Sequence, residues 1–462
     1  MNFKLKKTLS LLFILFTSLF TQVLSIHAEK SILKYLNEPI SVNEIIKNYS
    51  GLVGLGLAVF ILFLSRRHTV QNVIKIMHGF SLIAAIVFFF IITPYNNWFS
   101  LPASSLEFTN SFLQTEHKEI ILKHWHMIIF YGLVVHWSQA MLVLFYGYTN
   151  ELFNFKKASK YYPLFGVFAL ILNTFLTPII IKFIQQTVPL LTTFSLYWYY
   201  IQGCVIIFFI ITSFLAYSYL FNKSKNTSKK DENESKMGWG YASAIGVLAG
   251  FSGLIILISK TVWKYNDGLE FPSPSQYTHH LSSIGAFSSI ATLISLGVLI
   301  FMSFCLEEKL GKAWKNFYYA ISLITVILGL TFFCFTLFDN LFCKTFLHTI
   351  TVVSAAYHLL ITSIAYPVIL SLKEVAIIAI EKKYRFTAKL IIDLFFVKGF
   401  IFFGHLILWA LVQFLGSITL AFPYLAIVFF LCSFSRFIFI YYIGSNLPQV
   451  SMSDNHKNHI AS

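Results

Sequence analysis

Long apolar stretches separated by short polar loops fill most of the chain. A helix needs about 20 residues to cross a membrane. Eleven stretches approach or exceed this length, and each is continuously apolar, whereas membrane-spanning strands would alternate apolar and polar positions. They lie at about 50–65, 76–95, 123–148, 161–183, 193–221, 237–261, 281–305, 315–338, 345–371, 390–415 and 420–444. The pattern predicts an all-α fold, a polytopic transmembrane bundle of 11–12 helices.

The twelfth helix depends on residues 1–28. Three lysines near the N-terminus precede an apolar run from Leu9 to Leu24, which is the shape of a signal peptide. A cleavage site there is poor, because Ile26 occupies a position that favours a small residue. The segment is therefore either a signal-like sequence or a retained first transmembrane helix, followed by an outer segment at 29–49.

Basic residues occur in every second loop. By the positive-inside rule these loops and the C-terminal tail, 445–462, lie in the cytoplasm. The transmembrane helices then form two blocks, 50–221 and 237–444, joined by a flexible charged cytoplasmic linker at 222–236. The basic residues are Arg66, Arg67, Lys75, Lys156, Lys157, Lys160, Lys223, Lys225, Lys229, Lys230, Lys309, Lys312, Lys315, Lys373, Lys382, Lys383, Arg385 and Lys389. We expect a multi-pass protein of a bacterial-type inner membrane.

Composition supports the same class. The chain of 462 residues is 57% hydrophobic and only 11% charged, whereas soluble domains carry about 25% charged residues. The net charge of +15 would suggest a nucleic-acid partner in a soluble protein. Here it follows from the topology, so the lipid bilayer is the expected partner and nucleic acid is not. The five cysteines are scattered without a CxxC pair, which argues against thiolate metal sites.

Several histidines fall at the predicted outer boundary. Neutral imidazoles beside the carboxylates of the outer loops suit copper or zinc. The alternative is that these side chains simply sit at the level of the lipid headgroups. The candidate metal ligands are His124, His126, His279, His280 and His348.

Three other histidines, His136, His358 and His405, lie deeper, at similar heights in the outer half of the bilayer. Two imidazoles at one depth on facing helices are what a b-type haem requires. We therefore consider His136 with His358 as haem ligands and His405 as the alternate. The competing interpretation is a buried histidine that hydrogen-bonds to a neighbouring helix.

Few other charges occur inside the predicted spans. Asp393 and Lys398 lie in the inner half of 390–415, and Arg436 lies in the inner half of the last helix. Because these two helices form a hairpin, Arg436 is a possible partner for Asp393. Such a pair would be structural, since a buried charge needs a partner, or would serve proton entry.

The chain resembles the haem-copper oxidase catalytic subunit (subunit I), in particular its cbb3-like members. The resemblance rests on the aromatic run Tyr197–Gly203 and on Leu347-His348 followed by Tyr357-His358. It implies a low-spin haem b at His358. It also implies a degenerate copper and high-spin haem centre. Ala356 stands where that family has the histidine ligand of its high-spin haem, and the run that contains Gln202 lacks the copper-ligating histidine.

The first functional hypothesis is therefore a subunit of a respiratory electron-transfer complex. Its expected partners are other respiratory subunits and quinol or cytochrome c, and any activity would be that of a cytochrome oxidase-like oxidoreductase. The alternatives are a copper or zinc permease, and a non-catalytic membrane scaffold or assembly subunit.

Overall fold

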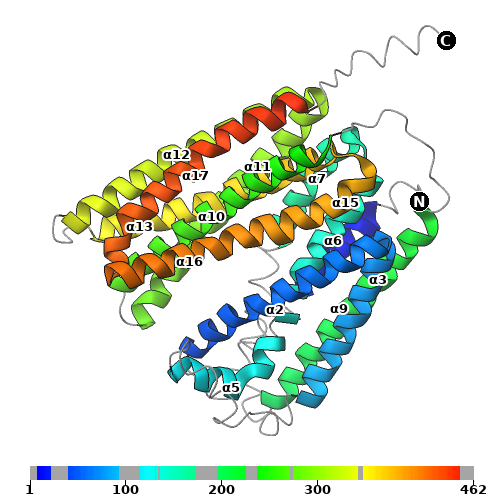
Figure 1. Cartoon of the computed structure of the whole chain (residues 1–462), viewed down its shortest axis with the longest axis horizontal. Coiled ribbons are helices and arrows are strands. Elements are labelled where there is room, and N and C mark those ends of the chain that lie inside the picture. Colours follow the sequence, from blue (N-terminus) through cyan, green and yellow to red (C-terminus); the bar gives the residue numbers. More distant parts are fainter. Residues whose placement is uncertain are drawn as a thin grey trace. The chain divides into compact units, whose positions relative to one another are not determined.

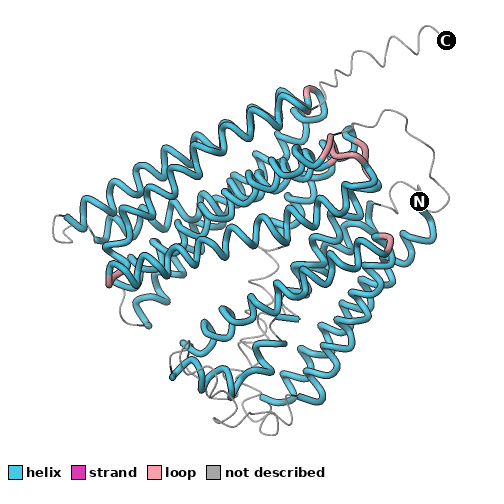
Figure 2. Tube along the Cα trace, in the orientation of Figure 1, coloured by secondary structure: helices cyan, strands magenta, loops and turns pink. Residues whose placement is uncertain are grey.

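The computed structural model describes residues 8–21, 40–92, 115–130, 132–133, 136–172, 195–224, 237–270, 274–341 and 347–447. In these residues the secondary structure is helical, apart from an isolated β-bridge between Met237 and Ile380. Figure 2 shows the helices as the cyan segments of the trace. The predicted all-α transmembrane bundle is confirmed.

Eight helices of the described part are long and apolar enough to cross a membrane. They are Val70–Ile92, Tyr200–Phe221, Trp239–Trp263, Ile290–Glu307, Leu310–Leu337, Thr351–Ile377, Lys382–Leu415 and Ile418–Asn446. Thr8–Thr21 is a shorter apolar helix.

The chain divides into two compact units. The first comprises Met1–Thr149 and Ile171–Asp231. In it α3 packs against α9 and α2 against α5, and Phe20 of the first helix lies 4.6 Å from Phe209 of α9 between ring centroids. Its helices are α2 (Ile40–Arg67), α3 (Val70–Val87), the π-helix η1 (Phe88–Ile92), α5 (Thr115–Phe130), most of α6 (His136–Leu152) and α9 (Ser195–Ser224).

The second unit comprises Asn150–Leu170 and Glu232–Ser462. Two of its candidate spans, Thr351–Ile377 and Lys382–Leu415, contain the π-helices η6 (Leu360–Ala365) and η7 (Ile391–Val397). Its helices are α7 (Phe155–Ile171), α10 (Trp239–Glu270), α11 (Pro274–Glu308), α12 (Leu310–Leu341), α13 (Leu347–Leu359), η6 (Leu360–Ala365), α14 (Tyr366–Ile377), α15 (Lys382–Leu390), η7 (Ile391–Val397), α16 (Lys398–Leu415) and α17 (Ile418–Asn446).

Helix α10 is the core of the second unit and contacts α13, α16, α17 and η7 (Figure 1). In its most apolar window 72% of the residues are buried, against 28–44% in the other candidate spans. Its glycines permit this packing: a Cβ on Gly246 or Gly250 would lie 2.6 Å from the ring of Phe396 or Phe400. Small residues of this kind allow membrane helices to approach closely.

The predicted hairpin of the last two helices is present. Gly416 ends α16 with a φ of 76°, a left-handed conformation that glycine adopts without a Cβ clash. Ser417 then caps α17 by accepting a hydrogen bond from the Leu420 amide. The short turn reverses the chain direction, and α17 lies in the same unit as η7.

Candidate functional site

Four charged side chains are buried together in the second unit where α14 ends and the next membrane segment begins. Lys373 and Glu374 belong to α14, Lys389 to α15 and Asp393 to η7. Each is at most 9% exposed. We call these four residues the charge cluster.

Both lysines of the charge cluster contact both carboxylates. The Lys373 ammonium pairs with Asp393 and lies 3.3 Å from Oε1 of Glu374. The Lys389 ammonium pairs with the same Glu374 oxygen and with Asp393, four residues further along the helix. With two positive and two negative charges the cluster is neutral, which is the condition for keeping charges away from water.

A shell of hydrogen bonds supports the charge cluster. Nδ2 of Asn150 donates to Oε2 of Glu374 at 3.3 Å, and the Tyr162 hydroxyl donates to Oδ1 of Asn150. Arg385 donates to the carbonyl oxygens of Asn150, Ile378 and Ile380 at 2.8–3.2 Å. These bonds fix the turn between α14 and α15, so the cluster is part of the rigid framework of this unit.

Arg436 of α17 presents a different arrangement. It is 1% exposed, and its Nε and Nη2 atoms have no hydrogen-bond partner among the described residues. Among the described residues, the titratable groups close enough to act on its charge are Tyr318, Tyr357 and Cys432, none of them a carboxylate. The partner that the sequence suggested, Asp393, pairs with the two lysines of the charge cluster instead.

Hydroxyl groups that lack partners in the described part of the chain accompany Arg436. They are the Tyr357 hydroxyl on α13 and Oγ of Ser433, three residues before Arg436 on α17. A buried guanidinium without a carboxylate partner carries an uncompensated desolvation penalty, so binding of an anion beside it is strongly favourable. Oxyanions such as carboxylate and phosphate match its planar fork of N–H donors. Arg436 is therefore the candidate anion contact of this unit.

The predicted haem ligands lie in different settings. His136, in the first unit, has Nδ1 3.3 Å from Oε1 of Gln139, and a Cβ on Gly54 would lie 2.7 Å from its ring. His358, in the second unit, stacks on Trp263 with ring centroids 4.6 Å apart and has Nδ1 3.5 Å from the Ser259 hydroxyl. His405 is exposed on α16. Helix backbone thus occupies space beside the half-buried His136 ring, and an indole occupies space beside the buried His358 ring, where a macrocycle would have to lie.

The predicted outer metal ligands are only partly described. His124 and His126 are buried in the first unit with ring centroids 6.3 Å apart. His279 and His280 belong to α11 and His348 to α13, but their side chains lie outside the described residues. Within the described part, no group of three histidine, cysteine or acidic residues is arranged to hold a metal ion.

The helix arrangement is that of solved membrane transporters. A bacterial homologue of the iron transporter ferroportin in an outward-facing state has a TM-score of 0.64 and 12% identity, covering 96% of this chain and all of that chain. The human organic anion transporter MFSD10 has a TM-score of 0.54 and 12% identity, covering 94% of this chain and all of that chain. At such low identity the likeness establishes the fold alone.

The family follows from sequence. Residues 1–446 match the model of the TLC ATP/ADP transporter family, so the chain belongs to that family. ADP,ATP carrier protein 1 of Chlamydia muridarum is 24% identical over 338 residues, which are 67% of this chain and 63% of the carrier. ADP,ATP carrier protein 5 of Rickettsia typhi is 23% identical over 378 residues, 73% of this chain and 71% of the carrier. The chain thus spans less than two thirds of the chlamydial carrier.

Membership in a transporter family corrects the functional hypotheses. The resemblance to the haem-copper oxidase subunit was wrong, and with it the haem b, the copper, the respiratory partners and the electron-transfer role. The copper or zinc permease is not supported either. The oxidase resemblance rested on pairs such as Tyr357-His358, and so short a pattern recurs by chance in a chain rich in aromatic residues.

Proposed function

We propose that this chain is a nucleotide carrier that exchanges ATP for ADP across a bacterial-type inner membrane, with its C-terminus in the cytoplasm. The observation that carries the proposal is the family match over residues 1–446. The alternating basic loops support the orientation. The relatives named ADP,ATP carriers in bacteria and in the chloroplast of Arabidopsis thaliana support the substrate class.

Arg436 is our proposed contact for a phosphate group of the nucleotide. A polyphosphate that leaves water needs cationic donors to replace its hydration. The lysines of the charge cluster are neutralised by their own carboxylates. Arg436 has two donor atoms without partners in the described residues, and the Tyr357 and Ser433 hydroxyl groups offer further donors.

Transport in a reconstituted system tests the function. The purified chain is placed in proteoliposomes loaded with ADP, and uptake of labelled external ATP is measured. We expect uptake that depends on internal ADP and disappears when the vesicles are loaded with buffer alone. Folded, reconstituted protein that moves neither nucleotide would contradict the proposal.

The Arg436→Gln variant tests the site separately from the function. Charge-assisted hydrogen bonds contribute about 1.5–3 kcal/mol, so we expect the KM for ATP to rise by roughly 10- to 100-fold. Arg436→Lys should fall between the two, because it keeps the charge without the fork of donors. Lys156→Gln, at an exposed position, is the control and should transport like the wild type. Unchanged uptake by Arg436→Gln would remove Arg436 from the site and leave the proposed function standing.

A further inference from the structure

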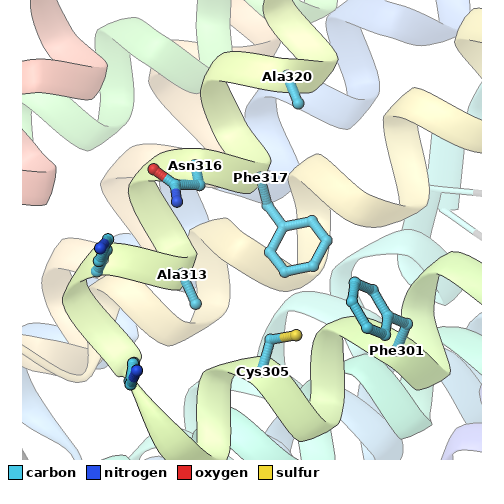
Figure 3. Close-up of a pocket in the computed structure, with 8 residues that line it drawn as sticks. Phe301, Cys305, Ala313, Asn316, Phe317 and Ala320 are labelled. Carbon is cyan, nitrogen blue, oxygen red and sulfur yellow. The ribbon is translucent and has the colours of Figure 1, made fainter.

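A groove lies between α11 and α12 in the second unit, near the loop that joins them (Figure 3). Its volume is about 450 Å³. Phe301 and Cys305 of α11 form one wall, and Asn316, Phe317 and Ala320 of α12 form the other (Figure 3). The rings of Phe301 and Phe317 lie edge to face at 6.0 Å between centroids. Apart from Asn316, the side chains that line the body of the groove are apolar.

The end of the groove near the loop is basic. Lys309 and Lys312 line it and are exposed. Neither ammonium group has an ion pair or hydrogen bond with a side chain that the structure describes. Nearby cations are engaged elsewhere: Lys315 lies 4.5 Å from the centre of the Tyr441 ring, and Lys160 pairs with Glu307 at 3.3 Å. Two charges thus remain available at one end of an apolar groove.

The groove opens onto a face of both helices on which described apolar side chains are exposed. Phe301 and Phe304 of α11 are 62% and 64% exposed, and Leu323 of α12 is 53% exposed. An exposed apolar face of this kind on membrane-spanning helices faces the lipid chains. The candidate spans end at Glu307 and begin again at Leu310, so Lys309 and Lys312 lie at the headgroup level.

We propose that this groove is a binding site for an anionic phospholipid of the cytoplasmic leaflet. The phosphate lies between Lys309 and Lys312, and an acyl chain lies along Phe301 and Phe317. Basic pockets between transmembrane helices at the cytoplasmic side recognise anionic headgroups in this way. A free nucleotide fits less well, because most of the groove is apolar and opens toward the lipid.

Lipid retention by the full chain tests the site. The protein is placed in nanodiscs of equal parts phosphatidylglycerol and phosphatidylcholine, extracted into mild detergent and weighed with its bound lipids by native mass spectrometry. Each lysine near an anionic surface accounts for about a five-fold preference. The Lys309→Gln/Lys312→Gln variant should therefore retain phosphatidylglycerol at least five-fold less. Lys156→Gln/Lys157→Gln removes two exposed lysines at the start of α7 and should behave like the wild type.

A second variant separates the groove from simple surface charge. In Cys305→Trp the indole fills the apolar part of the groove and leaves both lysines in place. We expect this variant to retain less phosphatidylglycerol as well. Excess inorganic phosphate or ATP should not displace the lipid from the wild type. The proposal is overturned if the lysine variant retains the lipid, if the filled groove keeps it, or if ATP displaces it. Recovery of each folded variant at the wild-type elution volume makes these outcomes comparable.

Discussion

At the residue scale, the charge cluster and Arg436 show two ways to keep charge inside a membrane protein. In the cluster each lysine touches both carboxylates, so that any single neutralisation leaves an unbalanced charge. Arg436 lacks such a carboxylate partner among the described residues. The first arrangement balances its own charges, whereas the second leaves a buried cation whose proposed partner is a phosphate group of the substrate.

The cluster's role predicts a double-mutant result. Removing one partner of a buried ion pair typically costs about 3–5 kcal/mol, whereas replacing both partners with apolar residues is often nearly neutral. We expect Asp393→Leu alone to lower the thermal unfolding temperature strongly, and Lys373→Met/Asp393→Leu to recover most of the loss. Thermal unfolding of the detergent-solubilised variants measures this. Purely additive losses in the double variant would show that the two side chains do not stabilise each other.

Depth in the predicted spans identified Asp393 and Arg436 as buried charges from sequence, but it missed the other members of the cluster. Lys373 and Lys389 stand at the edges of apolar stretches, where they count as ordinary topology-setting lysines. Their burial depends on the turn that Arg385 fixes between α14 and α15. Such packing is tertiary and has no signature in hydropathy.

At the element scale, close approach defines the contact of α10 with the segment that contains η7 and α16. Phe396 and Phe400 lie over Gly246 and Gly250, one helical turn apart on each side. Gly253 continues the same face, where a Cβ would lie 3.3 Å from Ile401. Hydropathy predicted both helices, but it did not identify this glycine stripe (Gly246, Gly250 and Gly253) as their interface, because apolar residues surround it on every side.

Adding a side chain to this stripe should push the helices apart. Overpacking of a filled interior typically costs about 1–3 kcal/mol, so we expect Gly250→Val to reduce thermal stability, and Phe400→Ala to restore part of it in the double variant. Gly297→Ala on α11 is the matched control, since a Cβ there meets nothing within 4 Å. Thermal unfolding in detergent compares the three. Equal losses at Gly250 and Gly297 would mean that the contact with Phe400 does not limit the approach.

At the scale of the whole molecule, hydropathy was sufficient for the fold class and insufficient for the function. Because lipid offers no hydrogen-bond partners, each spanning segment must satisfy its backbone N–H and C=O groups internally, as a helix does. Continuous apolar runs in the sequence indicate such helices directly. Transport specificity leaves no comparable signal. The similarity to the chlamydial carrier is recognised over 338 residues at 24% identity, a comparison that a single sequence does not offer.

The orientation of the whole chain is open to a direct test. Five basic loops alternate with weakly basic ones. The cost of moving the lysines and arginines of each basic loop across the membrane favours the arrangement with all five loops inside. Retention of the first helix, which packs its Phe16 and Phe20 against Phe209, would place the N-terminus inside as well. A reporter that fluoresces only in the cytoplasm should then be fluorescent when it is fused after residue 226 or after Ser462. A fusion after Glu270 should activate an exported phosphatase. Phosphatase activity from a fusion at either of the first two sites would contradict the predicted orientation, and with it the leaflet assigned to the lipid groove.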